Sequence, residues 1–207
     1  MSLLICTVRQ DRISLCVDTD ATRPDGSRFR TSKILPLVHA NAALAGRGNE
    51  GFLSAVYLHC LHFGGVDIEG LQEQMQFALI SVAAQIVQSG LSYADEKAGL
   101  DGGQEIILAG FSSQEQRQMV RVYRGNIANG IFFQTDIGVD SFTVAPATWD
   151  QQREIAPPLE TVADMASVAR AQVAWLRKAK PGCAAGGDLI AARIERGRMT
   201  ISKECEL

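Results

Sequence analysis

The sequence predicts a single α+β domain, and three observations support this fold class. Apolar residues alternate or run together in short stretches through the first quarter of the chain, as in β-strands. From Asn49 onward they recur at intervals of three and four residues, as on one face of a helix. Strand patterns return after residue 104. A chain of 207 residues, 46% of them hydrophobic, needs only one core, so we expect one domain over 1–207.

The first quarter of the chain predicts two pairs of strands. Residues 3–9 and 12–18 lie on either side of a polar turn and indicate a β-hairpin. Residues 23–26 contain proline and glycine at turn positions and are expected to form a loop. Residues 31–37 and 40–45 predict the second pair of strands.

Two helices are expected next. The first carries an apolar stripe over residues 52–61 and is stopped by two glycines at 64 and 65. Asp67 can cap the second helix, because a carboxylate accepts hydrogen bonds from the free N–H groups of a first helical turn. Its apolar stripe continues from Leu71 to Val87.

The remaining elements are strands on both sides of a third helix. The helix is predicted over 162–176 and ends before Pro181. The strands are predicted over 105–111, 118–124, 130–135 and 141–145 before it, and over 188–195 and 198–203 after it. This order suits two antiparallel sheets with helices outside, although layer packing alone also permits other α+β arrangements.

Composition excludes several classes of protein. A net charge of −3 and the absence of a Lys/Arg run argue against nucleic acid or an anionic membrane as a partner. No stretch is long and apolar enough to span a bilayer, and the start lacks the features of a secretion signal, so we expect a cytoplasmic protein. Five cysteines without Cys-x-x-Cys spacing indicate reduced, mostly buried thiols: Cys6, Cys16, Cys60, Cys183 and Cys205.

Asp18 and Lys33 are the most informative charged residues. Each lies at the edge of an apolar stretch, where a single buried charge is costly, so we expect them to pair with each other or with a third polar group. The nearest third group is the amino terminus at Ser2. A purely structural ion pair is the alternative, and an arginine, at 9, 28 or 30, could equally partner Asp18.

Several segments together resemble the proteasome β-subunit branch of the N-terminal nucleophile (Ntn) hydrolases. LLICTVRQDRISLCVDTDAT resembles the first hairpin of that family, TSKILPL its lysine strand, LAGRGNEGF the segment that opens its first helix, and GGDLIAARIERGRMTI its last hairpin. The resemblance implies a four-layer αββα sandwich of two antiparallel sheets. It also implies an amide-bond hydrolase of the peptidase type that uses a free chain end as catalyst.

The resemblance carries family roles onto particular residues. Removal of Met1, expected before a small residue, would make Ser2 both nucleophile and base, because its hydroxyl and free amine share one carbon. Lys33 would keep that amine neutral by lowering its pKa, and Asp18 would hold Lys33. The resemblance also implies that Gly46 donates a hydrogen bond to the oxyanion and that Thr22 and Asn49 contact the substrate. Each of these three residues could instead serve only the turn or loop that contains it.

Some departures from the family favour a second hypothesis. Aligning the first strand with a one-residue deletion in the turn places Leu3, which cannot attack a carbonyl, at the nucleophile position. The family's acid and hydroxyl before the last strands are absent from the segment GCAAGG at 182–187. The alternative is therefore a catalytically inactive relative that keeps the fold for assembly or for ligand binding.

The resemblance also bears on partners. It implies a homo-oligomer, of the ring type, and a peptide or small amide as substrate. No cofactor is expected. His59 and His62, with Cys60 between them, could approach a zinc ion, but a fourth ligand is not evident, so we expect helix histidines and no metal.

Overall fold

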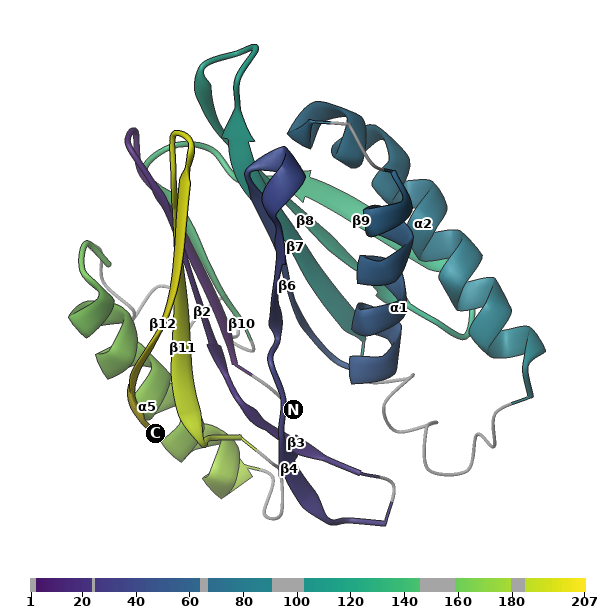
Figure 1. The fold of residues 1–207 in the computed structure, drawn as a ribbon. Coiled ribbons are helices and arrows are strands. Elements are labelled where there is room, and N and C mark those ends of the chain that lie inside the picture. The colour runs from purple at the N-terminus through teal and green to yellow at the C-terminus, as the bar shows by residue number, and fades with distance from the viewer. Residues whose placement is uncertain (1–2, 24, 64–66, 91–102, 146–158, 180–184) are drawn as a thin grey trace.

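The computed structural model describes residues 3–23, 25–63, 67–90, 103–145, 159–179 and 185–207. These residues form four layers, with two helices on one side, two sheets face to face, and one helix on the other side (Figure 1). The expected α+β sandwich of two antiparallel sheets with helices outside is confirmed.

The first sheet has five strands in the order β10-β1-β2-β11-β12, and all neighbours are antiparallel. It is formed by β1 (Leu4–Val8), β2 (Ile13–Asp18), β10 (Ser141–Ala145), β11 (Asp188–Glu195) and β12 (Arg198–Glu206). The predicted hairpin of the first two strands is present, and its register sets Leu4 opposite Val17. Leu3 and Asp18 therefore lie at the same end of this hairpin.

The second sheet has five antiparallel strands in sequence order. They are β5 (Ile34–Leu37), β6 (Ala42–Arg47), β7 (Gln104–Ser112), β8 (Arg117–Asn126) and β9 (Ile131–Asp136). A 3-10 turn at Val38–Ala40 separates the first two, and Asn41 follows it with a φ of 46°. Because β10 joins the first sheet through β1, the second β block does not form a sheet of its own.

A short hairpin lies where the sequence indicated only a loop. Its strands, β3 (Asp20–Thr22) and β4 (Arg28–Arg30), project from the end of the sandwich at which the chain starts (Figure 1). The predicted turn at its tip is present, since Gly26 N–H donates to the Arg23 carbonyl. The hairpin thus extends β2 beyond Asp18.

The helices begin at side-chain caps that the sequence supplies. The Asn49 side chain accepts from Phe52 N–H and starts α1 (Glu50–His62), and Asp67 accepts from Gly70 N–H and starts α2 (Ile68–Gln88). The third helix, α5, spans Val162–Ala179. No helix of the described residues is long and apolar enough to cross a membrane.

Three apolar interfaces hold the layers together. One lies between α1, α2 and the second sheet, one between the two sheets, and one between the first sheet and α5. Strand alternation divides each strand between two of them. In β2, for instance, Val17 faces the other sheet while Cys16 faces α5.

Candidate functional site

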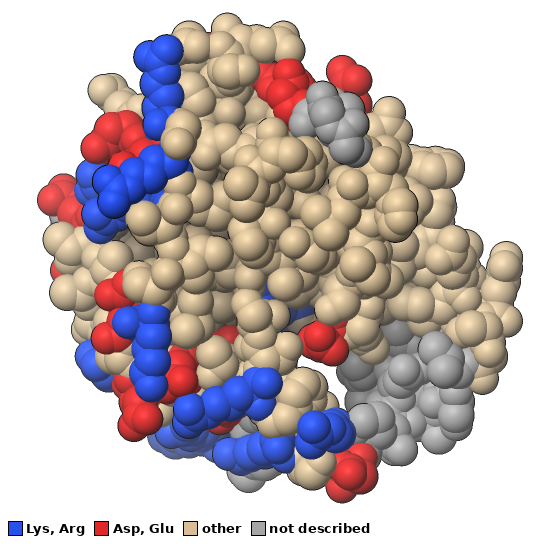
Figure 2. Space-filling model, in the orientation of Figure 1, with Lys and Arg blue, Asp and Glu red and all other residues tan. Residues whose placement is uncertain are grey.

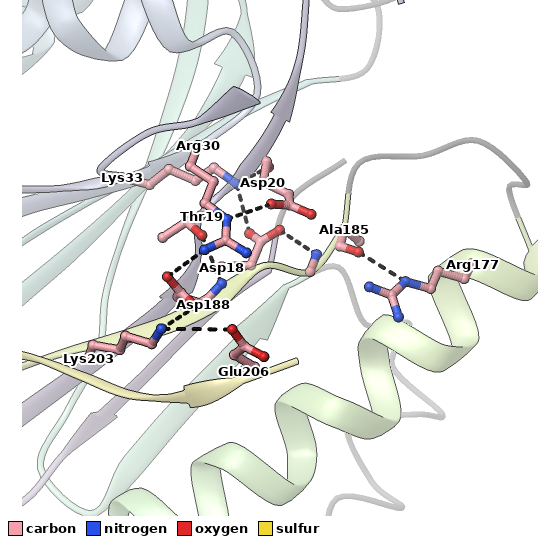
Figure 3. A network of polar contacts seen from close by, with 11 residues as sticks. Asp18, Thr19, Asp20, Arg30, Lys33, Arg177, Ala185, Asp188, Lys203 and Glu206 are labelled. Carbon is pink, nitrogen blue, oxygen red and sulfur yellow. Dashed lines mark hydrogen bonds and ion pairs between the residues drawn. The ribbon is translucent and has the colours of Figure 1, made fainter. Parts of the chain in front are cut away.

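Asp18 ends β2 with its side chain fully buried, and both of its carboxylate oxygens are held. Oδ1 accepts from the backbone N–H of Leu3 at 2.8 Å and from Lys33 Nζ at 2.9 Å. Oδ2 accepts from the backbone N–H of Gly186 at 3.1 Å. Three donors from three distant segments therefore converge on one carboxylate. Figure 3 shows Lys33 and the turn after Ala185 on either side of Asp18.

Lys33 lies directly before β5 and is 4% exposed. Its ammonium also donates to the Asp20 carbonyl at 2.6 Å. Burial lowers the pKa of Lys33, against the opposing effect of Asp18. Burial likewise raises the pKa of Asp18, although Lys33 and the two N–H donors oppose that shift. Burial and the Asp18 carboxylate therefore act on the charge of Lys33 in opposite directions.

The turn that leads into β11 closes the site from the side of α5. Gly186 N–H binds Asp18, while the Gly186 carbonyl accepts from Asp20 N–H at 3.2 Å. Both glycines of this turn have positive φ, +136° at Gly186 and +76° at Gly187. A Cβ on Gly187 would lie 2.3 Å from Asp20 Oδ1, so only glycine fits there.

A ring of charges surrounds the buried pair. Arg30 Nη1 donates to Asp188 at 3.0 Å, Lys203 Nζ lies 2.8 Å from the same carboxylate, and Arg30 Nε lies 3.8 Å from Asp20. Thr19 connects the ring to the backbone, because its hydroxyl accepts from Asp188 N–H at 2.8 Å. These contacts fix the β3–β4 hairpin against β11 and β12 (Figure 3).

The space beside the hairpin is open. Figure 2 shows a hollow next to the β3–β4 hairpin, with Lys and Arg side chains along its lower rim. Three exposed arginines belong to this hairpin: Arg23, Arg28 and Arg30. Arg23 lies 4.6 Å over the Phe29 ring, and Arg30 binds Asp188.

The proposed nucleophile, Ser2, lies outside the described residues. Leu3, which follows it in the chain, is fully buried on the α5 side of the first sheet with Ile5 and Cys16. The Leu3 nitrogen is bonded covalently to the carbonyl carbon of Ser2 and lies 2.8 Å from Asp18. The Leu3 side chain belongs to the core, and its N–H belongs to the site.

Gly46 is close to Lys33, but its N–H is already used. It donates to the Lys33 carbonyl at 3.1 Å, as part of the pairing between β5 and β6. A Cβ on Gly46 would lie 2.8 Å from Leu53 Cδ1 of α1, so close packing accounts for the glycine. The oxyanion role expected of Gly46 would require this strand hydrogen bond to break.

Gly48 directly follows β6, which ends at Arg47 opposite Glu105 of β7. Among the described residues we find no acceptor for the Gly48 N–H. Gly48 has a φ of +119°, and a Cβ there would lie 2.2 Å from Gln104 Oε1.

The two expected substrate-contact residues lie near the site without reaching the pair. Thr22 is exposed on β3, opposite Arg28. Asn49 caps α1 with its side chain, and its N–H donates to Gln104 Oε1 at 2.7 Å. Neither residue is hydrogen-bonded to Asp18 or Lys33 within the described ranges.

A second buried carboxylate lies at the same end of the second sheet. Glu105, 3% exposed, is bound by Arg47 Nε at 2.9 Å and by Arg124 Nη2 at 2.8 Å. Arg124 Nη2 also donates to Thr143 Oγ1 of β10 at 3.3 Å, so this cluster connects the two sheets. Sequence reasoning did not identify it.

Other candidate groups serve the fold. Arg9 pairs with Asp140 rather than Asp18. His62 Nδ1 bonds the Leu58 carbonyl, and the His59 ring packs against Phe63. Cys6, Cys16, Cys60 and Cys205 are free thiols, the first three buried, while Cys183 lies outside the described residues. Among the described residues, no group of three metal-binding side chains is found.

Comparison with known proteins supports the fold. No protein-family model and no curated protein matches the sequence. A solved structure of a mutant of Anbu from Hyphomicrobium sp. strain MC1 matches with a TM-score of 0.62 and 12% identity, covering 99% of this chain and 88% of that one. Anbu is a proteasome β-subunit-like homologue of the Ntn hydrolases. The resemblance seen in the sequence is confirmed for the fold, which is the proteasome-like Ntn-hydrolase fold.

Proposed function

We propose that this protein is an amide-bond hydrolase of the proteasome-like type, acting on peptides or small amides through a free chain end at Ser2. One observation carries the proposal. The buried pair of Asp18 and Lys33 is hydrogen-bonded to the N–H of Leu3, the residue next to Ser2.

Each group then has a role in acyl transfer. The Ser2 hydroxyl attacks the substrate carbonyl carbon and gives its proton to the Ser2 α-amine, which passes it to the leaving amine as the C–N bond breaks. Water then hydrolyses the ester and restores the hydroxyl. Lys33 favours a neutral α-amine through its charge, and Asp18 fixes Lys33 in position.

Gly48 is the better candidate for the oxyanion donor. The Gly46 N–H is bonded to the Lys33 carbonyl, whereas the Gly48 N–H has no acceptor among the described residues. A developing oxyanion is stabilised by an N–H group that is already oriented toward it. We assign this role to Gly48 in place of Gly46.

The chain end provides the first test. Intact mass, measured on protein expressed without an added leader, should show loss of Met1; retention would remove the nucleophile. A fluorescent β-lactone should then form an ester with Ser2. Ser2→Ala should abolish labelling, while Ser54→Ala, a half-buried serine of α1, should leave it unchanged. Equal labelling of both variants would exclude Ser2.

A catalytically inactive relative is the second candidate, because the Gly46 N–H is occupied and the family's acid and hydroxyl are absent at 182–187. It predicts no β-lactone adduct on protein that has lost Met1.

The two candidates share one further proposal, a homo-oligomer. The outer helices expose large apolar side chains that a second copy could cover: Leu58, Phe77 and Ile80, at 56%, 61% and 44%. Light scattering that shows a monomer at all concentrations would contradict assembly.

A further inference from the structure

We infer that Arg177 of α5 is a positioning residue for the buried Asp18–Lys33 pair and acts through the Ala185–Gly186 turn. The inference rests on the proposed function for its catalytic meaning, but the contacts themselves stand without it. Arg177 is exposed, lies eight residues before Ala185, and does not touch Asp18 or Lys33 within the described ranges.

Arg177 is hydrogen-bonded to the turn. Arg177 Nε donates to the Ala185 carbonyl at 3.2 Å, reaching from the last turn of α5 (Figure 3). Ala185 is fully buried with Val173 and Leu176 of the same helix. The guanidinium and the apolar contact together fix the turn against α5.

The Arg177 guanidinium also packs closely against Gly186. A Cβ on Gly186 would lie 2.3 Å from Arg177 Nη2 and 3.6 Å from Asp20 Oδ2. The planar guanidinium therefore occupies the space that a side chain at 186 would fill. This contact, with the positive φ, accounts for glycine at a position whose N–H must point at Asp18.

The peptide group between Ala185 and Gly186 connects Arg177 to the Asp18 carboxylate. Gly186 N–H is the donor found for Asp18 Oδ2 among the described residues, and the peptide group before it contains the Ala185 carbonyl that Arg177 holds. Since a peptide group is rigid and planar, fixing its oxygen also fixes the direction of its N–H. Arg177 thus sets the donor on which the carboxylate depends.

The other charges around Asp18 come from different elements. Lys33 precedes β5, Asp20 and Arg30 belong to the β3–β4 hairpin, and Asp188 with Lys203 belongs to the last two strands. None of these side chains contacts the Ala185 carbonyl in the described part of the chain. The effect of Arg177 on Asp18 is therefore separable from theirs.

The test is the titration of the Asp18 carboxyl carbon by NMR, assigned by its loss in Asp18→Asn. Losing one hydrogen bond to a charged group changes a pKa by about one unit, so we expect Arg177→Met to raise that of Asp18 by roughly half a unit, because the Asp20 N–H still holds Gly186. Arg177→Lys, which keeps a donor, should raise it less and provides the measurement if the Met variant does not fold. Arg170→Met, an exposed arginine on the same helix, should leave it unchanged.

Two outcomes would overturn the inference: a loss of thermal stability in Arg177→Met with an unchanged Asp18 titration, and no change in either. The titration requires no turnover. If it shifts as expected while the β-lactone does not label Ser2, the positioning role stands and the proposed hydrolase fails.

Discussion

Asp18 and Glu105 are two buried carboxylates at the same end of the sandwich, and they are bound in different ways. Asp18 is held by one lysine whose side chain is 5% exposed and by two backbone N–H groups. Glu105 is held by two arginines whose side chains are 20% and 47% exposed. One site is enclosed and uses a lysine, whereas the other is half open and uses arginines.

The two carboxylates differ in whether the cation that binds them can lose its charge. A lysine can lose its proton, and burial lowers the pKa of Lys33, whereas an arginine keeps its charge at any working pH. The Glu105 cluster contacts both sheets through Arg124, whereas the Asp18 pair is closed off from solvent and bound to the residue next to the proposed nucleophile, Ser2.

Lys33→Met should have the largest effect on stability. It leaves the buried Asp18 carboxylate without its charged partner, which typically costs about 3–5 kcal/mol of the free energy of unfolding. Urea denaturation at pH 7.5 measures this loss. An unchanged midpoint would show that the pair contributes nothing to the fold.

The same variant should lose less stability at pH 5. Burial raises the pKa of Asp18 above its ordinary value of 3.8, and removing Lys33 raises it further. Between the pKa of Asp18 in the native protein and its higher pKa in the variant, the folded variant binds a proton that the unfolded chain does not. The stability of the variant therefore increases as the pH falls through this range. A deficit that is equal at pH 5 and pH 7.5 would contradict the assigned cause.

Glu105→Gln should have an intermediate effect. It keeps the shape of the side chain but leaves two arginines without a counter-charge, and because both are partly solvated we expect a loss of about 1–3 kcal/mol. Urea denaturation of Lys33→Met and Glu105→Gln side by side gives the ranking. A larger loss for Glu105→Gln would reverse the comparison.

Much of the fold follows from local sequence pattern. The apolar alternation of β1 and β2, the caps at Asn49 and Asp67 and the glycine of the β11–β12 turn all act within a few residues. The pairing of strands does not follow from local sequence pattern. Nothing local in residues 141–145 shows that β10 pairs with β1, because that choice depends on contacts across more than a hundred residues.

The candidate site divides in the same way. The Asp18–Lys33 pair could be predicted because two single charges at the ends of apolar stretches are costly to bury apart. The role of Gly186 could not, since its N–H reaches Asp18 across 168 residues of chain. The available signal was the pair of glycines directly before a strand. The family resemblance implied an oxyanion role for Gly46, but the direction of its N–H depends on strand register.

Thr143→Val should have the smallest effect and tests whether the Glu105 cluster connects the two sheets. Valine has nearly the shape of threonine but cannot accept the hydrogen bond from Arg124, which at 3.3 Å is already long. Arg124 keeps Glu105 and is half exposed to water, so we expect a loss of at most about 1 kcal/mol. In Glu105→Gln, Arg124 is no longer fixed by charge, so the same substitution should cost still less there. A double-mutant cycle by urea denaturation measures this coupling. Strict additivity would mean that Arg124 binds Glu105 and Thr143 independently, without energetic coupling between the two contacts.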